Sequence, residues 1–194
     1  MATANKVHFG LKNVHYAVIT YTSGVPSWGT VKAVPGAVSV SLAKEEGTVD
    51  FFADDVKYYH LAANNGYSGT LEMADFPAEM RKDLWNQDIT TTGKLLVEDV
   101  NVQPAEFALL FEIDGDQSPD RYCFYRCVAS RPDVTGTTKE DSIEPQTKTV
   151  DITATSIYVA AIPGNVVKAR AEEGSTAYSS FFSTVQVPTS GGTT

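Results

Sequence analysis

The residues that could do chemistry are few and lie far apart. The three histidines, His8, His15 and His60, lack the close spacing with further ligands that zinc sites use. Paired carboxylates can act as general acid and base in glycoside hydrolysis, and the chain carries three such pairs: Glu45–Glu46, Asp54–Asp55 and Glu172–Glu173. Each pair lies in loop-like sequence, which favours solvated charge. We therefore predict that the chain is not an enzyme and has no catalytic site, no metal site and no cofactor.

Two further patterns have structural explanations. Asp114–Gly115–Asp116 resembles the start of a calcium loop but lacks the full series of ligands with its closing glutamate, and Asp and Gly favour tight turns. Cys123 and Cys127 lie in a stretch with the composition of a strand. Four residues along a strand span about 13 Å, which is too far for a disulfide. We expect a turn at the first site and, at the second, two reduced cysteines on one strand face.

Composition and charge restrict the class of protein. The chain has 194 residues, of which 42% are hydrophobic and 20% charged, which indicates a folded globular domain. Its 15 Lys and Arg against 24 Asp and Glu give a net charge of −9, which disfavours binding to DNA or an anionic membrane by bulk attraction. The N-terminal residues show no secretory signal, and no apolar run approaches the about 20 residues of a membrane span. We expect a soluble protein made in the cytoplasm, with no membrane partner.

The elements that position these residues are mostly strands. β-Branched and aromatic residues alternate with polar ones in the segments 13–22, 37–42, 57–62, 67–73, 94–98, 106–113, 121–130 and 147–155. Asn64–Asn65–Gly66 predicts a hairpin turn between the third and fourth of these. The segment Tyr178–Val187 fits either a strand or a helix.

One helix is expected after Asp75, which can cap it. Met80, Leu84 and Trp85 form its apolar stripe and predict how it packs. Together the elements predict a mainly β fold, an antiparallel β-sandwich or split barrel with one flanking α-helix.

The segment from Ala43 to Asp55 is expected to be a long polar loop. One lysine against five carboxylates gives it a net charge of −4; the carboxylates are Glu45, Glu46, Asp50, Asp54 and Asp55. It also carries Phe51 and Phe52, which either fold back onto their own domain or dock onto a neighbouring subunit, because apolar groups on an exposed loop mark interaction sites.

Five blocks of sequence, in order, resemble a known family. They are Asn5–Tyr16, Pro35–Leu42, Asn64–Glu72, Phe107–Asp116 and Thr138–Thr147. These blocks, spread over about residues 5 to 155, are similar to the major tail protein of long-tailed, non-contractile bacteriophages (siphoviruses) of Gram-positive hosts.

The resemblance implies a structural virion protein with the phage tail tube fold. Six copies would form a ring, and rings would stack into a hollow tail tube through which genome DNA passes without specific binding. Its partners would be further copies of itself, the tape measure protein, and the tail terminator and tip proteins. The expected location is the virion tail, after assembly in the host cytoplasm.

The resemblance also assigns roles to parts of the chain. Residues 1–194 would be one tail tube domain, with an N-terminal arm (1–12), an inter-ring loop (about 43–55) and a C-terminal arm (about 170–194), too short for an extra immunoglobulin-like domain. Contacts between subunits or rings are expected at the five carboxylates and two phenylalanines of the loop and at Tyr178, Phe181 and Phe182 of the C-terminal arm.

Two other functions stay open. A β-sandwich at a tail tip could bind carbohydrate or a receptor, with Trp28 on its binding face; the alternative for Trp28 is a loop anchor. A small β-fold hydrolase would need a convergent carboxylate or histidine site, which the sequence does not show.

Overall fold

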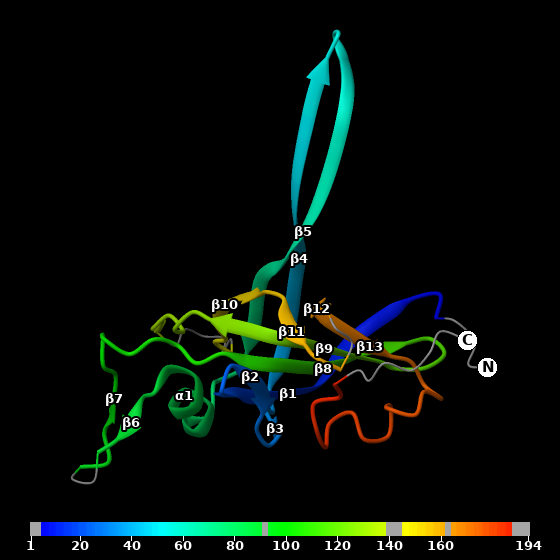
Figure 1. Cartoon of the computed structure of the whole chain (residues 1–194). Coiled ribbons are helices and arrows are strands. Elements are labelled where there is room, and N and C mark those ends of the chain that lie inside the picture. Colours follow the sequence, from blue (N-terminus) through cyan, green and yellow to red (C-terminus); the bar gives the residue numbers. More distant parts are fainter. Residues whose placement is uncertain (1–4, 91–92, 139–144, 162–163, 188–194) are drawn as a thin grey trace.

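The computed structural model describes residues 5–90, 93–138, 145–161 and 164–187 (Figure 1). Over these residues the fold is mainly β with a large antiparallel sheet and one helix, which confirms the expected class. The elements are β1 (His8–Thr22), β2 (Val25–Trp28), β3 (Lys32–Ala33), β4 (Ala37–Ala53), β5 (Val56–Met73), α1 (Ala78–Trp85), β6 (Asp88–Ile89), β7 (Leu96–Val97), β8 (Phe107–Gly115), β9 (Asp120–Ala129), β10 (Lys148–Ala154), β11 (Ile157–Val159), β12 (Gly164–Val166) and β13 (Lys168–Ala171).

The main sheet has the strand order β2-β1-β8-β9-β10-β5-β4, with β3 paired to β1 and β13 to β9. β1 and β4 are not neighbours in this order, yet they approach each other in space. The sheet therefore curls into a sandwich-like split barrel, and its inner face encloses the main core.

β8 is buried on both faces because a separate layer covers each one. Phe107, Leu109 and Phe111 point into the main core, while Ala108 and Leu110 point to the opposite side. The second side is covered by the chain from β11 onward, including Phe181. The apolar alternation expected at 106–113 is thus confirmed, and both of its phases are buried.

Helix α1 packs as the sequence predicts. Met80, Leu84 and Trp85 are buried in the main core, and the Trp85 indole Nε1–H donates to the Ala129 carbonyl oxygen over 3.1 Å. The prediction that Asp75 caps the helix is wrong.

Ion pairs explain the position of Asp75. Its carboxylate is 2.7 Å from Lys148 Nζ and 3.2 Å from Arg81, and it accepts the N–H of Phe76 rather than a helical N–H. Lys148 hydrogen bonding holds the pKa of Asp75 below its usual value. Asp75 therefore joins the start of the helix to β10.

The two cysteines are free and buried, as expected, but they lie on opposite sides of the sheet. The prediction that they share a face is wrong because a β-bulge separates them: Phe107 pairs with Cys127 and Leu109 with Phe124, so two residues of β9 oppose one of β8. The extra residue reverses the alternation of side chains along the strand.

Two other segments differ from expectation. Tyr178–Val187 is neither helix nor strand but a series of turns followed by irregular chain. The burial of Phe181 in the second core, rather than a ladder of backbone hydrogen bonds, holds this segment against the sheet. The strand expected at 94–98 is reduced to the two residues of β7, which pairs with β6.

Candidate functional site

The segment Ala43–Asp55 is not a loop, and this prediction is corrected. Its residues up to Ala53 continue β4, which pairs with β5 as far as Ala53–Val56. Asp54 and Asp55 have positive φ values of 51° and 57°, the conformation of a tight hairpin turn that Asp tolerates. Together the two strands form a long hairpin that projects from the body (Figure 1). Charge made the segment resemble a loop, but a strand of an exposed hairpin can carry charged side chains because both of its faces meet solvent.

The predicted turn at Asn64–Gly66 is also wrong, because these residues lie inside β5. Gly66 has φ 107°, and a Cβ atom there would collide with the carbonyl oxygen of Ala154. Glu45 pairs with Gly66 and Glu46 with Asn64, which leaves Asn65 as the extra residue of a bulge. The sequence predicts a turn here because glycine allows the positive φ that a turn needs, but the positive φ of Gly66 belongs to a β-bulge instead.

The bulge marks the point where the hairpin leaves the body. β10 pairs with β5 only as far as Tyr67, which faces Ala154. Beyond that point β4 and β5 pair with each other alone. A bulge bends its strand and increases the local twist, which accounts for the direction of residues 46–64, here termed the projecting hairpin.

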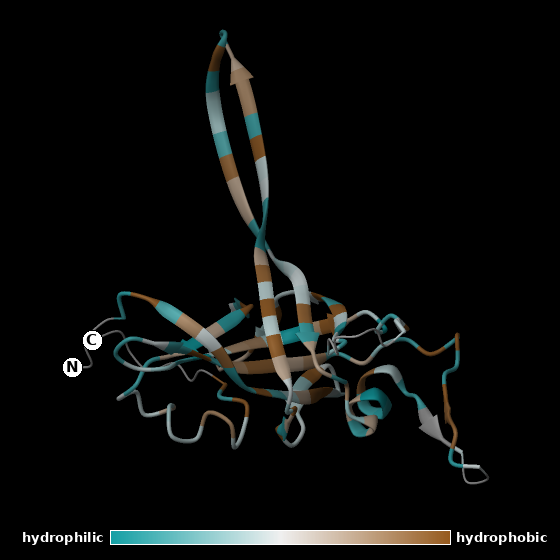
Figure 2. Cartoon of the chain, turned by 180° about the vertical axis from the view of Figure 1, so that it is seen from behind, coloured by the Kyte–Doolittle hydropathy of each residue, from teal (hydrophilic) through white to brown (hydrophobic). Residues whose placement is uncertain are grey.

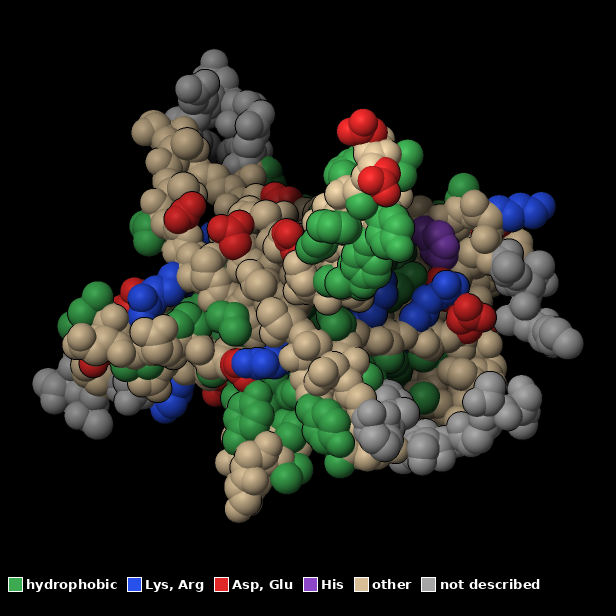
Figure 3. All heavy atoms as spheres, turned by 45° about the horizontal axis from the view of Figure 1, so that its top comes forward, with side chains coloured by type: hydrophobic (Ala, Val, Ile, Leu, Met, Phe, Trp, Pro, Cys, Tyr) green, Lys and Arg blue, Asp and Glu red, His purple; other side chains and the backbone are tan. Residues whose placement is uncertain are grey.

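One side of the projecting hairpin is apolar. Val49 pairs with Leu61 and Phe51 with Tyr59, so all four side chains lie on the same side, here termed the apolar face. Their exposed fractions are 60% for Val49, 57% for Phe51, 52% for Tyr59 and 49% for Leu61. Figure 2 shows the alternation of hydropathy along the hairpin, and Figure 3 shows hydrophobic side chains gathered over it. Such a face, unpartnered in the single chain, marks an interaction site.

The opposite side of the hairpin carries charge. Asp50 is 2.8 Å from Lys57 Nζ and also contacts the His60 ring. Hydrogen bonds from Lys57 and then His60 hold the pKa of Asp50 below its usual value. Phe52 pairs with Lys57 and so lies on this side, away from Phe51. Phe51 therefore lies on the apolar face, whereas Phe52 lies on the opposite side with Asp50 and Lys57.

The structure distributes the other four predicted carboxylates between the tip and the base of the hairpin. Asp54 and Asp55 form the exposed turn. At the base, Glu46 pairs with Lys44 over 2.7 Å, while Glu45 accepts the Ser68 hydroxyl. They form no single acidic centre.

The predicted contact residues of the C-terminal arm pack on their own chain. Phe181 is buried in the second core, and Phe182 stacks on the His15 ring with centroids 4.5 Å apart. The Arg121 guanidinium lies 3.8 Å from the centre of the Tyr178 ring and 4.8 Å from that of Phe182. Whether these residues also meet a second copy stays a prediction, and residues 188–194 lie outside the described chain.

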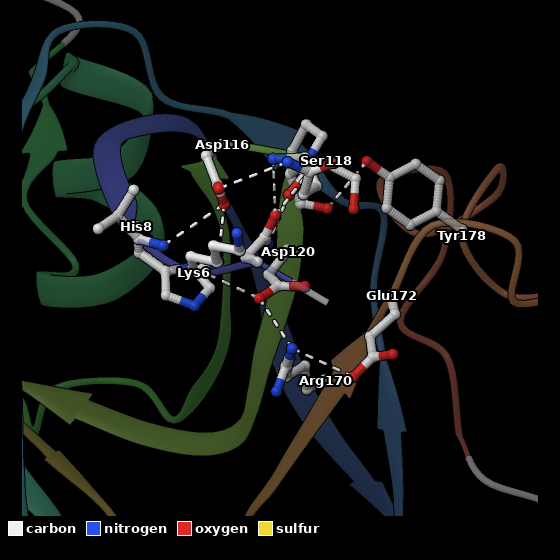
Figure 4. A network of polar contacts seen from close by, with 12 residues as sticks. Lys6, His8, Asp116, Ser118, Asp120, Arg170, Glu172 and Tyr178 are labelled. Carbon is white, nitrogen blue, oxygen red and sulfur yellow. Dashed lines mark hydrogen bonds and ion pairs between the residues drawn. The ribbon is translucent and has the colours of Figure 1, made fainter. Parts of the chain in front are cut away.

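The described part of the N-terminal arm is hydrogen-bonded to the connection between β8 and β9 (Figure 4). The Asn5 amide donates to the Ser118 carbonyl oxygen over 2.7 Å and accepts the N–H groups of Gln117 and Ser118. The Asp116 carboxylate accepts the Lys6 N–H over 2.7 Å. The turn expected at 114–116 is displaced along the chain, because Asp114 and Gly115 belong to β8 and pair with β1, so that the chain reverses at 116–119. Its partner Asn5 carried no local signal. Residues 1–4, and 139–144 of the last sequence block, lie outside the described chain.

Beside this turn, a buried carboxylate joins two distant strands. Asp120 is almost fully buried, and its Oδ2 lies 3.0 Å from Arg170 of β13 and 3.6 Å from the His8 ring nitrogen. Arg170 also contacts Glu172 over 3.1 Å, which places one member of the expected Glu172–Glu173 pair in an ion pair. These contacts join the first residue of β9 to the start of β1 and to β13.

Sequence reasoning missed a wide groove of about 1160 Å³ beside β2. Its walls come from three distant segments: Tyr21–Thr30, Ser156–Ala161 and Ser183–Val187. Trp28 forms part of the wall. It donates its indole N–H to the Tyr125 carbonyl oxygen over 2.9 Å and packs edge-on against the Tyr125 ring. Trp28 thus anchors its segment to β9 while it also borders the groove.

Among the described residues, no cluster of three or more histidine, cysteine, aspartate or glutamate side chains could hold a metal ion. The described helix is too short and polar to cross a membrane. Comparison with models of known protein families finds no match. No curated protein matches the chain either.

Proposed function

We propose that this chain is a structural virion protein that assembles into stacked hexameric rings and forms the hollow tail tube of a long-tailed, non-contractile bacteriophage. The observation that supports this most is the projecting hairpin with its exposed apolar face, carried on an antiparallel β-sandwich with one helix. The five sequence blocks that resemble siphovirus major tail proteins specify the kind of assembly.

Two physical features favour self-assembly. The sheet ends in β2 on one side and β4 on the other, and open strand edges tend to pair with other chains unless they are covered. Joining such edges around a ring would satisfy them. The apolar face would then contact the next ring, and a head-to-tail contact that does not close on itself produces a filament.

The acidic composition suits a conduit for DNA. A net charge of −9 on each chain would be multiplied sixfold in every ring, and DNA adhesion depends on Lys and Arg pairing with phosphate. Carboxylates facing the channel would let DNA pass without sticking to the wall. The tape measure protein and the terminator and tip proteins are the further partners in this proposal, and the virion tail is the location.

Electron microscopy of the purified chain tests the proposal. Negative-stain images are expected to show rings or tubes at high protein concentration. Antibodies against the chain should label the tail shaft along its whole length in phage lysates. A chain that stays monomeric at every concentration and never co-purifies with tails would contradict the proposal.

Carbohydrate binding is a second candidate because the groove presents aromatic rings. Tyr21, Trp28 and Tyr158 all border it, and aromatic faces with a few polar groups are typical of ligand sites. The Trp28 N–H is already used within the chain, which leaves only its ring for a sugar. Saturable glycan binding that is lost in both Trp28→Ala and Tyr158→Ala would favour this function over the tube.

A further inference from the structure

We propose that the apolar face of the projecting hairpin of one copy docks in the groove beside β2 of another copy. This inference rests on the proposed function, and it names the surface that receives the hairpin. Both surfaces belong to the same chain and both leave apolar side chains in water.

The groove has the chemistry that the apolar face requires. Val25 and Tyr158 on its walls are exposed large hydrophobic residues, and Pro26, Val185 and Val187 add further apolar surface. Docking the apolar face would remove both sets from water at about 25 cal/mol per Å² of apolar area. Asn165 also lines the groove and brings a polar side chain to its wall.

Charge does not oppose this occupant. The tip of the hairpin carries Asp54 and Asp55, so a receiving surface must avoid like charge. Among the described residues that line the groove, Arg126 is the sole charged one, and no carboxylate is present. Arg126 is held in place by Glu106, with its Nη2 2.6 Å from the carboxylate. An acidic tip therefore meets no acidic side chain of the groove wall.

The two surfaces do not overlap, which a continuous assembly needs. No described residue of β4 or β5 lines the groove. One copy can therefore donate its hairpin while its own groove receives another, which is a heterologous, head-to-tail contact. At about 3.4 Å per residue, the strand from Glu46 to Ala53 reaches about 25 Å beyond the bulge, enough to extend past its own body toward a second copy.

Cysteine cross-linking in the full chain tests the contact. A Val49→Cys, Val25→Cys double variant places one thiol on the apolar face and one on the groove wall. The control, Val49→Cys, Val100→Cys, keeps the hairpin thiol and moves the other to an exposed valine outside the groove. Native thiols should stay silent, because burial raises the pKa of Cys127 to about 12 and that of Cys123 well above its usual value.

Treatment with a short bismaleimide at assembling concentrations is expected to produce a ladder of dimers, trimers and larger species from the Val25 variant only. A ladder of equal strength from the Val100 control, or no ladder although tubes are visible, would overturn this inference and leave the proposed function standing. If the unmodified chain does not associate at all, both fail. A glycan that saturates the groove of assembled tubes would also overturn the inference, since the groove would then be empty of hairpin.

Discussion

Replacing Phe51 by serine should weaken self-association far more than replacing Phe52 by serine. The two phenylalanines are adjacent, of one type and nearly equally exposed, at 57% for Phe51 and 62% for Phe52. They differ in the side of the hairpin on which they lie: Phe51 belongs to the apolar face, whereas Phe52 pairs with Lys57 on the charged side. Phe52→Ser is therefore a matched control for the loss of an exposed aromatic ring.

The size of the effect follows from the area that docking would cover. Complete burial of a phenylalanine contributes about 1.5–3 kcal/mol. Phe51 has somewhat more than half of its surface exposed in the free chain, so docking it contributes about 1–1.5 kcal/mol per contact. Because about 1.4 kcal/mol corresponds to a tenfold change in affinity, Phe51→Ser should weaken each contact by about five- to tenfold.

Sedimentation velocity over a concentration series measures association, and urea unfolding of the dilute chain measures the fold. Both serine variants should unfold within about 0.5 kcal/mol of the unmodified chain, since exposed substitutions change stability little. Equal weakening by the two variants, or a larger effect of Phe52→Ser, would refute the assignment of the apolar face as the docking side. A large loss of stability in Phe51→Ser alone would show that the ring supports the fold instead.

Two further predictions concern the base and the charged side of the hairpin. Gly66→Ala should destabilise the chain by more than Gly24→Ala in urea unfolding. Both glycines have positive φ, which costs about 1–2 kcal/mol for a residue with a Cβ. Of these two, only at Gly66 would the added Cβ collide with backbone, at the Ala154 carbonyl oxygen. Equal losses would contradict the close approach of β5 to β10. Lys57 lowers the pKa of Asp50 in the folded chain, so the pairing supports the hairpin above the ordinary carboxyl pKa of about 3.9 and is lost as the pH falls through the lower folded value. An NMR titration should place the Asp50 midpoint below that ordinary value and move it upward in Lys57→Met; a midpoint at or above the ordinary value would rule out the pairing.

The local sequence pattern was enough to predict which side of a strand or helix is buried, wherever the element is regular. The alternation of Phe107, Leu109 and Phe111 predicted a core strand, and the spacing of Met80 and Leu84 predicted the buried side of the helix, because side-chain direction repeats with a fixed period in each element. The mainly β class follows from the same periodicity. The sequence also identified residues 43–55 as unusual, from two phenylalanines among carboxylates.

The sequence did not show which strand each segment pairs with, and that pairing changes the meaning of several motifs. Asn64–Gly66 has the composition of a turn, but pairing with Glu45 and Glu46 of β4 keeps it inside a strand as a bulge. The bulge between Phe124 and Cys127 likewise reverses which face the second cysteine occupies. Bulges depend on the register of a distant partner, which no local window contains.

The sequence by itself determined the β class, the helix stripe, the acidic net charge and the exposed pair Phe51 and Phe52. Only the tertiary structure decided that 43–55 is one strand of a projecting hairpin, that Phe51 and Phe52 face opposite ways, and that a groove forms from segments near residues 25, 158 and 185. The physical reason is that periodicity is a property of neighbouring residues, whereas register, bulges and grooves arise from contacts between residues far apart in the chain.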